Sequence, residues 1–321
     1  MVTLKDLAAA VGVSKAAVSY ALSDNPERRS KVSPETREKI LDAAKRLNYH
    51  PSLLGRGFSL SRSYNIALLL PRSCTGSISD HYLGMFHGVS SGIAASSYNL
   101  SVFFGCDDKF INSVQSGQLD GVTVIARNPE SPEFEKLGCL KPPVIFLNRT
   151  APAECPAAAS CRSDYAAWIK EVITRFMAEK LRKITVFIRP DRAGDHEIAV
   201  LAKKFCRENS LEYLCCRRDD FSPAHVFSDC GYIFCGSSPD IRSCLAENND
   251  ISYVMLASQE TTRDAKLDTR KLFYHDSVAI GRASVSLLID MVENHAAPAE
   301  LFIPLKQRGI SVARNSTIPE F

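Results

Sequence analysis

The first fifty residues carry apolar positions at helical spacing, interrupted by short polar turns. Thr3 and Asp6 have the spacing of a capping box, which predicts the start of a helix. Gly12 supplies a turn, and Ser14 can cap a second helix after it. Ser33 followed by a proline predicts a further helix that ends near residues 48–51. The N-terminal segment is therefore predicted to be a compact bundle of short helices.

Two short helices joined by a glycine turn are typical of a helix-turn-helix, in which the second helix reads DNA. Apolar residues of the second helix can pack it onto the first. The residues left exposed near its start are Lys15, Ala16, Ser19 and Tyr20. A recognition helix presents its N-terminal residues to base edges, so these positions suit that task.

From Asn65 onward, apolar strands alternate with helical stretches. The predicted strands span residues 66–70, 100–104, 121–125, 144–147, 183–188, 213–216, 232–235, 252–256, 271–274, 301–305 and 311–313. The predicted helices span residues 80–97, 109–116, 132–137, 164–179, 195–209, 239–248 and 278–293. This alternation predicts an α/β core of doubly wound parallel sheets. Gly84, Gly88 and Gly92 give the first of these helices a smooth face that can lie close to a sheet.

A segment rich in Pro, Ala and Cys at residues 150–159 is interpreted as a crossover between two lobes. The first lobe is predicted to contain about residues 63–150 and 276–300, and the second about residues 160–275 and 301–317. Two α/β lobes joined by several crossings form a hinged cleft. Ligands of open α/β sheets bind outside the carboxyl ends of the strands, so the cleft is the predicted ligand site.

Several segments together resemble the LacI/GalR family of bacterial transcription regulators. They are Thr3-Leu4-Lys5-Asp6-Leu7-Ala8, Gly12-Val13-Ser14, Val18-Ser19, residues 32–40, Leu47-Asn48-Tyr49-His50-Pro51 and residues 310–317. The resemblance covers essentially the whole chain and is most specific at the N-terminus. It implies a helix-turn-helix domain at residues 1–50, a hinge helix or linker at 51–62, and a periplasmic-binding-protein-like core for effector binding and dimerisation at 63–321.

The resemblance implies a sequence-specific DNA-binding regulator that acts as a repressor. Its expected partners are double-stranded DNA with a palindromic operator, a second copy of the chain in a homodimer, and a small-molecule effector in the cleft, often a sugar or nucleoside in this family. A second hypothesis keeps DNA binding but makes the protein effector-independent or architectural, with a degenerate sensor lobe. A ligand-induced change in DNA affinity distinguishes the two hypotheses.

By this resemblance, Lys15, Ala16 and Tyr20 are the base-reading residues. Tyr20 stands where many members have arginine, so a bidentate guanine contact is lost there and Lys15 becomes the main guanine reader. Hydroxyls, helix N-termini and loop cations suit phosphate oxygens. The phosphate-contact candidates are Thr3, Ser14, Ser19, Arg28, Arg29 and Lys31. The alternative is helix capping for the three hydroxyls and a solvated loop at residues 23–31 for the three cations.

Residues 52–60 resemble the family's hinge helix, which folds on operator DNA and inserts paired leucines into the minor groove. Leu54 and Phe58 are the hinge candidates, and Phe58 stands at the position of the inserted side chain. Gly55 and Gly57 each disfavour a helix by about 1 kcal/mol relative to alanine, so the hinge is expected to fold only on DNA. The alternative for Phe58 is an ordinary packing residue.

Charge is distributed unevenly along the chain. Residues 1–62 hold eleven Lys or Arg against six Asp or Glu, a net charge of +5. The remainder holds 28 against 30, a net charge of −2. A basic N-terminal module on a near-neutral body is expected for phosphate-backbone binding, with a solvated helix face as the alternative.

The predicted cleft departs from the family pattern. Ala257 or Ser258 occupies the place of a late aspartate, and the usual Asp-Asn pair at the lobe crossing is replaced by Arg162-Ser163. A cleft poorer in acids and richer in arginine indicates an anionic effector, such as a phosphorylated or acidic sugar, or no conventional effector. The effector-binding candidates are Ser79, His81, Tyr82, Arg149, Arg162, Trp168, Gln259 and His275. Each has a structural alternative, which for Trp168 is a place in the core.

Catalytic and cofactor motifs are missing from the sequence. It contains no P-loop, no glycine motif for dinucleotides and no nucleophile elbow, so neither enzyme activity nor a cofactor is expected. Its eleven cysteines form no CxxC pair and fit no metal site; buried thiols are expected, with redox sensing near Cys215 and Cys216 as the alternative. No apolar run reaches about 18 residues and no signal-peptide core is present, so a cytoplasmic location without membrane contact is expected.

Overall fold

A computed structural model describes residues 2–23, 26–50, 62–75, 78–126, 133–248, 250–257 and 267–307 of the protein. The chain divides into two compact units, Met1–Ser63 and Tyr64–Phe321. The predicted hinge, with Leu54 and Phe58, and the strand predicted at residues 311–313 lie outside the described residues.

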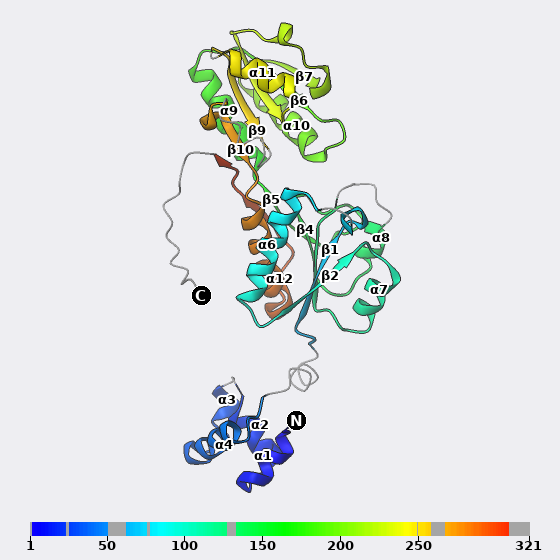
Figure 1. The fold of residues 1–321 in the computed structure, drawn as a ribbon, viewed down its shortest axis with the longest axis vertical. Coiled ribbons are helices and arrows are strands. Elements are labelled where there is room, and N and C mark those ends of the chain that lie inside the picture. The colour runs from blue at the N-terminus through cyan, green and yellow to red at the C-terminus, as the bar shows by residue number, and fades with distance from the viewer. Residues whose placement is uncertain are drawn as a thin grey trace. The chain divides into compact units, whose positions relative to one another are not determined.

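The N-terminal unit packs short helices around a small apolar core (Figure 1). The helices are α1 Leu4–Val11, α2 Lys15–Ala21, α3 Pro26–Arg29 and α4 Pro34–Arg46. Leu7, Val18 and Ile40 come from three of these helices and are fully buried in one cluster. The apolar spacing therefore produces the predicted bundle, because each helix turns one apolar face inward.

The helix ends follow the predicted capping chemistry. Thr3 Oγ1 accepts the backbone N–H of Asp6, and the Asp6 carboxylate accepts the backbone N–H of Thr3 over 2.8 Å, which completes a capping box. Gly12 ends α1 with a φ of 71°, a left-handed conformation that glycine adopts without steric cost. Ser14 and Ser33 accept backbone N–H groups at the starts of α2 and α4.

The segment predicted as a loop at residues 23–31 contains one helical turn, α3. Pro26 occupies its first position, acidic Glu27 lies in its first turn, and basic Arg28 and Arg29 lie in its last turn, where the helix dipole favours each charge. None of its residues is buried, so an apolar pattern cannot reveal it.

The second unit is built on two six-stranded sheets. The first sheet has the order β11-β5-β4-β3-β1-β2, and all its neighbouring strands are parallel. Its strands are β1 Asn65–Leu70, β2 Asn99–Phe104, β3 Gly121–Val124, β4 Val144–Leu147, β5 Ala159–Ser163 and β11 Glu300–Ile303.

The second sheet has the order β12-β10-β9-β8-β6-β7, in which only β12 is antiparallel to its neighbour. Its strands are β6 Lys183–Ile188, β7 Glu212–Arg217, β8 Cys230–Cys235, β9 Ser252–Leu256, β10 Leu272–Tyr274 and β12 Lys306–Gln307.

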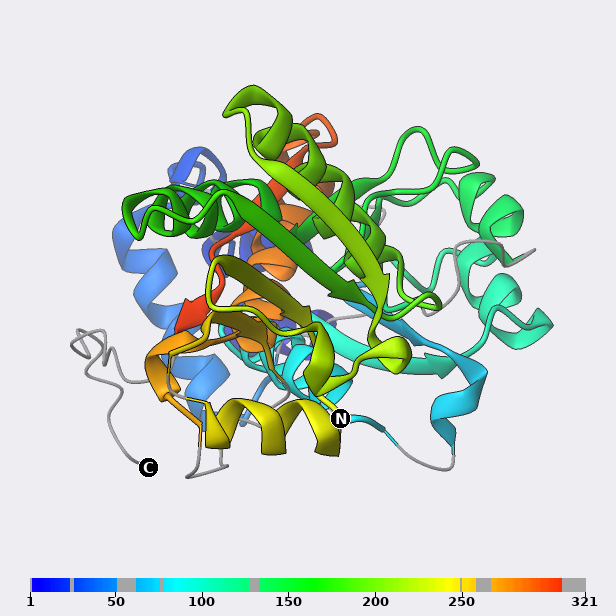
Figure 2. The same ribbon diagram turned by 90° about the horizontal axis from the view of Figure 1, so that it is seen from above.

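Helices cover both faces of each sheet, which confirms the doubly wound α/β core (Figure 2). The helices are α6 Asp80–Ala94, α7 Asp108–Gln115, α8 Glu133–Gly138, α9 Tyr165–Ala178, α10 Ala193–Glu208, α11 Pro239–Glu247 and α12 Ser277–Asn294. The short 3₁₀ turns are η1 Arg72–Thr75, η2 Arg218–Asp220, η3 Pro223–His225 and η5 Thr269–Lys271. On the first sheet, α6 and α12 pack on one face and α7 and α8 on the other. On the second sheet, α9 and α10 pack on one face and α11 on the other.

Alternation along β1 shows why both faces of the first sheet are covered. Ile66 and Leu68 pack with residues of α6 and α12, whereas Ala67 and Leu69 pack with residues of α7 and α8. Successive side chains of a strand point to opposite faces, so a continuous apolar run is buried on both sides.

The glycine face of α6 lies against α12, and the prediction that it lies against a sheet is wrong. A Cβ at Gly88 would lie 2.2 Å from the carbonyl oxygen of Val278, and a Cβ at Gly92 would lie 2.9 Å from the Cβ of Val285. Glycine therefore permits two helix backbones to approach closely. A four-residue glycine spacing on one helix does not by itself identify the element that it meets.

Two strands correct the predicted lobe boundaries. β5 is absent from the predicted strands, and the boundaries put residues 160–163 and 301–303 in the second lobe. Both β5 and β11 pair within the first sheet instead. The chain therefore crosses toward the second sheet after Ser163 and again after Ile303, a few residues later than predicted.

Candidate functional site

The start of α2 presents the predicted base-reading side chains. Lys15 and Ala16 are exposed in its first turn, and Tyr20 is partly buried one turn later. The ammonium of Lys31 lies 5.4 Å from the centre of the Tyr20 ring, within the range of a cation–π contact. Lys31 and Tyr20 therefore share one patch of the surface, although they lie in different segments of the N-terminal unit.

The predicted phosphate-contacting residues differ in whether their polar groups already make hydrogen bonds within the protein and in how exposed they are. Thr3 Oγ1 both accepts from the Asp6 backbone and donates to the Asp6 carboxylate, so its proton is committed to the cap. Ser14 Oγ accepts the backbone N–H of Ala17 over 3.1 Å, which leaves its proton for a further acceptor. Ser19 and the cations Arg28 and Lys31 are exposed, and Arg29 is partly buried. Capping is thus the observed role of two hydroxyls, and phosphate contact stays a prediction.

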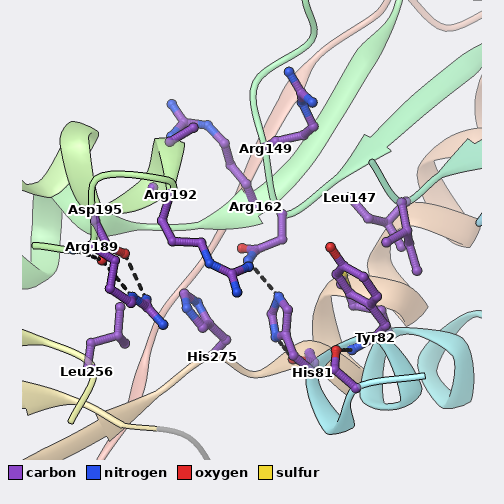
Figure 3. Close-up of a pocket in the computed structure, with 18 of the residues that line it drawn as sticks. His81, Tyr82, Leu147, Arg149, Arg162, Arg189, Arg192, Asp195, Leu256 and His275 are labelled. Carbon is purple, nitrogen blue, oxygen red and sulfur yellow. Dashed lines mark hydrogen bonds and ion pairs between the residues drawn. The ribbon is translucent and has the colours of Figure 1, made fainter. Parts of the chain in front are cut away.

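A cavity of about 870 Å³ lies in the second unit, at the carboxyl ends of strands from both sheets (Figure 3). Its walls include residues that directly follow β3, β4, β6 and β9. This is the location predicted for the ligand cleft of open α/β sheets. Cavities of this volume accommodate ligands of drug or sugar size.

Six of the predicted effector residues line this cavity. They are Ser79, His81, Tyr82, Arg149, Arg162 and His275. Trp168 is not among the lining residues, because its indole is 3% exposed and packs 5.6 Å from the Phe273 ring in the core of the second sheet. Its core alternative is therefore the observed one. Gln259 lies outside the described residues.

Asn148 joins the two histidines of the cavity through a continuous set of hydrogen bonds. Its Oδ1 accepts the backbone N–H of Ser163 over 3.3 Å and the Ser163 hydroxyl over 3.1 Å. Its Nδ2 lies 3.0 Å from Nε2 of His81, and His81 Nδ1 lies 2.8 Å from the hydroxyl of Ser277. The Ser163 hydroxyl in turn lies 2.8 Å from Nδ1 of His275.

The donors of this network fix the tautomer of His81. A backbone N–H can only donate, so the amide oxygen of Asn148 faces Ser163 and its NH₂ group faces His81. His81 Nε2 must therefore accept, and its proton lies on Nδ1, toward Ser277. A proton on both ring nitrogens would set two donors against each other, so the network requires a neutral His81.

The electrostatic surroundings also favour neutral imidazoles. Burial lowers the pKa of His81 to about 4, and the positive charges of Arg192 and Arg189 act in the same direction. Burial, His81 and Arg189 lower the pKa of His275 well below its usual value. The two rings lie 4.9 Å apart, so this part of the wall offers polar atoms without a positive charge at neutral pH.

Two acidic residues of the cavity are held by arginines. Asp195 is buried and accepts two bonds from the Arg189 guanidinium, over 2.8 and 2.9 Å, and a third from the Arg189 backbone over 2.9 Å. Glu197 accepts from Arg162, whose Nε also lies 3.4 Å from Glu300. Arg189 directly follows β6 of the second sheet, and Asp195 lies in α10, which packs on that sheet. Arg162 instead connects β5 of the first sheet with α10.

Sequence reasoning missed several of these polar residues. Asn148, Arg189, Glu197 and Ser277 line the cavity but are not among the predicted effector residues. Asn148 has a φ of 52°, a left-handed conformation that asparagine tolerates better than most residues. A polar residue directly after an apolar predicted strand, as in Leu147-Asn148 and Ile188-Arg189, is the signal that could have identified two of them.

Other chemistry is limited in the described part of the chain. Of its eleven cysteines, eight are buried, Cys139 and Cys215 are exposed, and Cys216 is partly buried. Burial raises the pKa of Cys155 to about 11, which disfavours the reactive thiolate. The described residues include no group of three or more potential metal ligands. Among the described helices, none has the length and apolar character needed to cross a membrane.

Comparison with known proteins identifies related sequences. Residues 3–52 match the family described as bacterial regulatory proteins, lacI family. The chain is 30% identical to the ribose operon repressor of Bacillus subtilis over 193 residues, which cover 59% of this chain and 55% of that protein. It is 31% identical to the probable HTH-type transcriptional repressor ExuR of Bacillus subtilis over 155 residues, or 46% of this chain and 44% of that protein. The chain thus matches about half the length of these relatives.

Solved structures with the same fold extend the likeness to most of the chain. The lac repressor dimer bound to operator and the anti-inducer ONPF superposes with a TM-score of 0.63 at 15% identity, covering 95% of this chain and 97% of that one. The LacI family regulator CCPA from Weissella paramesenteroides with bound sucrose gives a TM-score of 0.58 at 13% identity, covering 76% and 96%. Residues 3–52 thus match the lacI family of bacterial regulatory proteins, and the rest of the chain shares the fold of solved LacI family regulators.

Proposed function

We propose that this protein is a transcriptional repressor that binds a palindromic operator as a homodimer and responds to a small molecule in the cavity of its second unit. The observation that carries this proposal is the exposed first turn of α2, with Lys15 and Ala16 on a capped helix that follows a glycine turn. The names of the related repressors and the net charge of +5 over residues 1–62 support it.

In this proposal α2 enters the major groove and reads bases through Lys15, Ala16 and Tyr20. Lys15 contacts guanine, Ala16 offers an apolar contact, and Tyr20 contacts a base edge or thymine methyl. The hydroxyls of Ser14 and Ser19 and the charges of Arg28, Arg29 and Lys31 hold the phosphate backbone. The Thr3 hydroxyl can contribute only if it exchanges its bond to the Asp6 carboxylate for one to a phosphate. For Ser14, its uncommitted proton supports this role, and for Lys31 the contact with Tyr20 does.

Dimerisation sets the spacing of two such helices on DNA. One helix-turn-helix binds with modest affinity, so two copies related by a two-fold axis match two half-sites of a palindrome. We propose that Leu54 and Phe58 enter the minor groove between the half-sites, where an aromatic side chain can unstack a base step. The solved dimer on operator DNA that shares this fold supports the arrangement.

The cavity supplies the regulatory site. Its walls come from both sheets, and Arg162 bonds across them to Glu197, so a bound molecule can favour one relative position of the sheets over another. Related structures contain sucrose, glucose or cellobiose. A ligand that binds one arrangement more tightly changes DNA affinity by that difference in free energy. We propose Ser79, His81, Tyr82, Arg149, Arg162 and His275 as ligand-contacting residues.

Selection of binding sites from random duplex DNA by the full-length protein tests the DNA-binding part. The expected product is a palindrome with a flexible pyrimidine–purine step at its centre. Lys15→Ala should weaken binding to that site by about tenfold or more. Lys39→Ala is the matched control, because Lys39 is an exposed lysine of the same unit that pairs with Glu35 over 2.8 Å. Enrichment of no site, or equal losses for both variants, would contradict the proposal.

An effector-independent or architectural DNA-binding protein is the second candidate. The observation in its favour is that Asp195 and Glu197, two carboxylates able to bond sugar hydroxyls, are already held by Arg189 and Arg162. The two candidates differ in one measurement, the affinity for the selected DNA site with and without a molecule that binds the cavity. A change of about tenfold supports the regulated repressor, and an unchanged affinity with a saturated cavity supports the second candidate.

A further inference from the structure

We propose that the cavity binds a small hydroxylated organic anion, a carboxylate or a phosphate monoester, whose negative group lies beside Arg192 at the start of α10 and whose hydroxyls face the wall of His81 and Asn148. This inference rests on the proposed function, because it names the class of ligand that the cavity takes. It also places the anion, which the composition of the cleft alone does not do.

The charges of the residues that line the cavity favour a negatively charged ligand. The lining arginines are Arg149, Arg162, Arg189, Arg192 and Arg218, and the lining carboxylates are Asp80, Asp195 and Glu197. Asp195 and Glu197 are occupied by Arg189 and Arg162, and Asp80 lies exposed in the first turn of α6. Arg162 and Arg218 also pair with Glu300 and Asp219, which lie outside the lining. The positive charge that a bound anion can meet therefore centres on Arg192.

Arg192 is the cation best placed to meet a ligand. Among the described residues its only ion pair is with its neighbour Asp191, at 3.6 Å, and the Asp191 side chain is 72% exposed. A pair of this kind contributes little and is easily exchanged. Figure 3 shows the Arg192 side chain reaching from the start of α10 toward His81. Its positive charge also lowers the pKa of His81.

Backbone N–H groups beside Arg192 also favour an anion. Arg192 precedes the sixteen-residue helix α10 without a side-chain cap, and Ala193 and Gly194 of its first turn line the cavity. Among the described residues, the backbone N–H groups of Ala193 and Gly194 have no acceptor, unlike those of Asp195 and His196, which bond the Arg192 carbonyl. A carboxylate or phosphate oxygen beside Arg192 would satisfy these donors.

The opposite wall suits the uncharged part of the ligand. His81 and His275 are neutral, and the Asn148 amide is fixed by Ser163, so this side offers oriented polar groups. Ser79 and Tyr82 add hydroxyls from the start of α6. Hydroxyl groups of a sugar-sized molecule fit such a wall, while its charged group faces Arg192.

Isothermal titration calorimetry on the full-length protein without DNA tests the class of ligand. The probes are glucose, glucuronate, glucose 6-phosphate and inorganic phosphate, so that the ring is constant while the charged group changes. At least one anion should bind about tenfold or more tightly than glucose. Binding of glucuronate alone identifies carboxylate chemistry, and binding of glucose 6-phosphate or phosphate identifies phosphate chemistry.

Two variants test the location. Arg192→Gln should weaken binding of the anion by about tenfold or more, because a charge-assisted bond is lost. Arg207→Gln should leave binding unchanged, since Arg207 is an exposed arginine in the last turn of the same helix. A wild-type affinity in Arg192→Gln overturns the placement. Equal binding of glucose and the anions, or no binding of any probe at about 10 mM, overturns the class of ligand.

This test is separate from the test of the proposed function. Wild-type protein and Arg192→Gln should bind the selected DNA equally in the absence of any probe, since Arg192 belongs to the second unit. If an anion binds at Arg192 but DNA affinity does not respond to it, regulation fails and the anion site stands. If DNA affinity responds equally to glucose in both proteins, regulation stands and the anion site fails.

Discussion

The N-terminal unit and the arginine-rich cavity differ in how far apart in the sequence their bonded residues lie. The capping bonds of Thr3 and Ser14 each join residues three positions apart. In the cavity, His81 bonds Asn148 and Ser277 across 67 and 196 positions. Local chemistry therefore specifies the first site, whereas the second exists only once segments far apart in the sequence have packed together. Perturbations chosen in each unit can show whether the two are also independent in stability.

The largest effect is expected from Ile40→Ala, because the N-terminal unit has a small core. Ile40 is fully buried beside Leu7 and Val18, and its loss should cost about 4 kcal/mol in the free energy of unfolding. That is close to the whole stability of a small helical domain, so the unit should unfold well before the rest. Urea unfolding of the full chain, followed by circular dichroism, should show an early helical transition.

Tryptophan fluorescence provides the control for this prediction. Trp168 is the only tryptophan and is buried in the second unit, so its emission reports that unit alone. Its midpoint should not change in Ile40→Ala, and Ile40→Val should cost only about 1 kcal/mol. A shift of the Trp168 midpoint together with the helical signal would show that the two units unfold as one.

The second effect in size is expected from Gly88→Ala, at the crossing of α6 and α12. The added Cβ would lie 2.2 Å from the carbonyl oxygen of Val278 and 2.9 Å from the backbone nitrogen of Arg282. Backbone atoms cannot swing away, so the helices must separate, at a cost of about 3 kcal/mol. The urea midpoint of the main helical transition, followed by circular dichroism, should fall, whereas His87→Ala, at an exposed neighbouring position, should leave it unchanged. An unchanged midpoint in Gly88→Ala would contradict the observed helix contact.

Much of this architecture could be predicted from the sequence, and the exceptions have physical causes. Helix caps and strands such as β6 arise from residues within a few positions of one another, which a single sequence displays. β5 has the short and partly polar sequence Ala-Ser-Cys-Arg-Ser, and only its pairing between β4 and β11 makes it a strand. Its location therefore depends on tertiary structure.

The residues of the cavity were only partly predictable for the same reason. His81 and His275 could be identified as polar residues near strand or helix ends. Trp168 could not be told from a ligand contact, because an aromatic residue on an amphipathic helix suits both the core and a binding site. The pairing of Arg189 with Asp195, six positions away across a turn, depends on the start of α10 folding back to β6.

A third effect is expected from acidification, and it should act on the second unit. The folded pKa of His81, about 4, lies below the ordinary value of 6.5, so protons bind the unfolded chain first as pH falls. The stability contributed by neutral His81 is fully present above pH 6.5 and is lost between about 6.5 and 4. The loss should approach about 3 kcal/mol, and the lowered pKa of His275 acts in the same direction.

The measurement for this prediction is urea unfolding monitored by Trp168 between about pH 7.5 and 4.5. This range stays at or above the ordinary pKa of carboxylates, so that their protonation contributes little. His81→Gln should reduce the slope of stability against pH. His50→Gln is the matched control, because His50 is exposed and belongs to the N-terminal unit. A slope that is the same in all three proteins would show that His81 does not stabilise the folded cavity through its neutral form.

The smallest expected effect separates capping from phosphate contact in the recognition helix. Ser14→Ala removes the acceptor for the Ala17 backbone N–H and should destabilise the N-terminal unit by about 1 kcal/mol. Ser19→Ala should leave stability unchanged, because Ser19 is exposed and its side chain makes no hydrogen bond to the described residues. If both hydroxyls also hold phosphates, both variants should lose DNA affinity at a temperature where the unit stays folded. A loss of affinity in Ser14→Ala alone would assign the effect to the cap, since only that variant changes the start of α2.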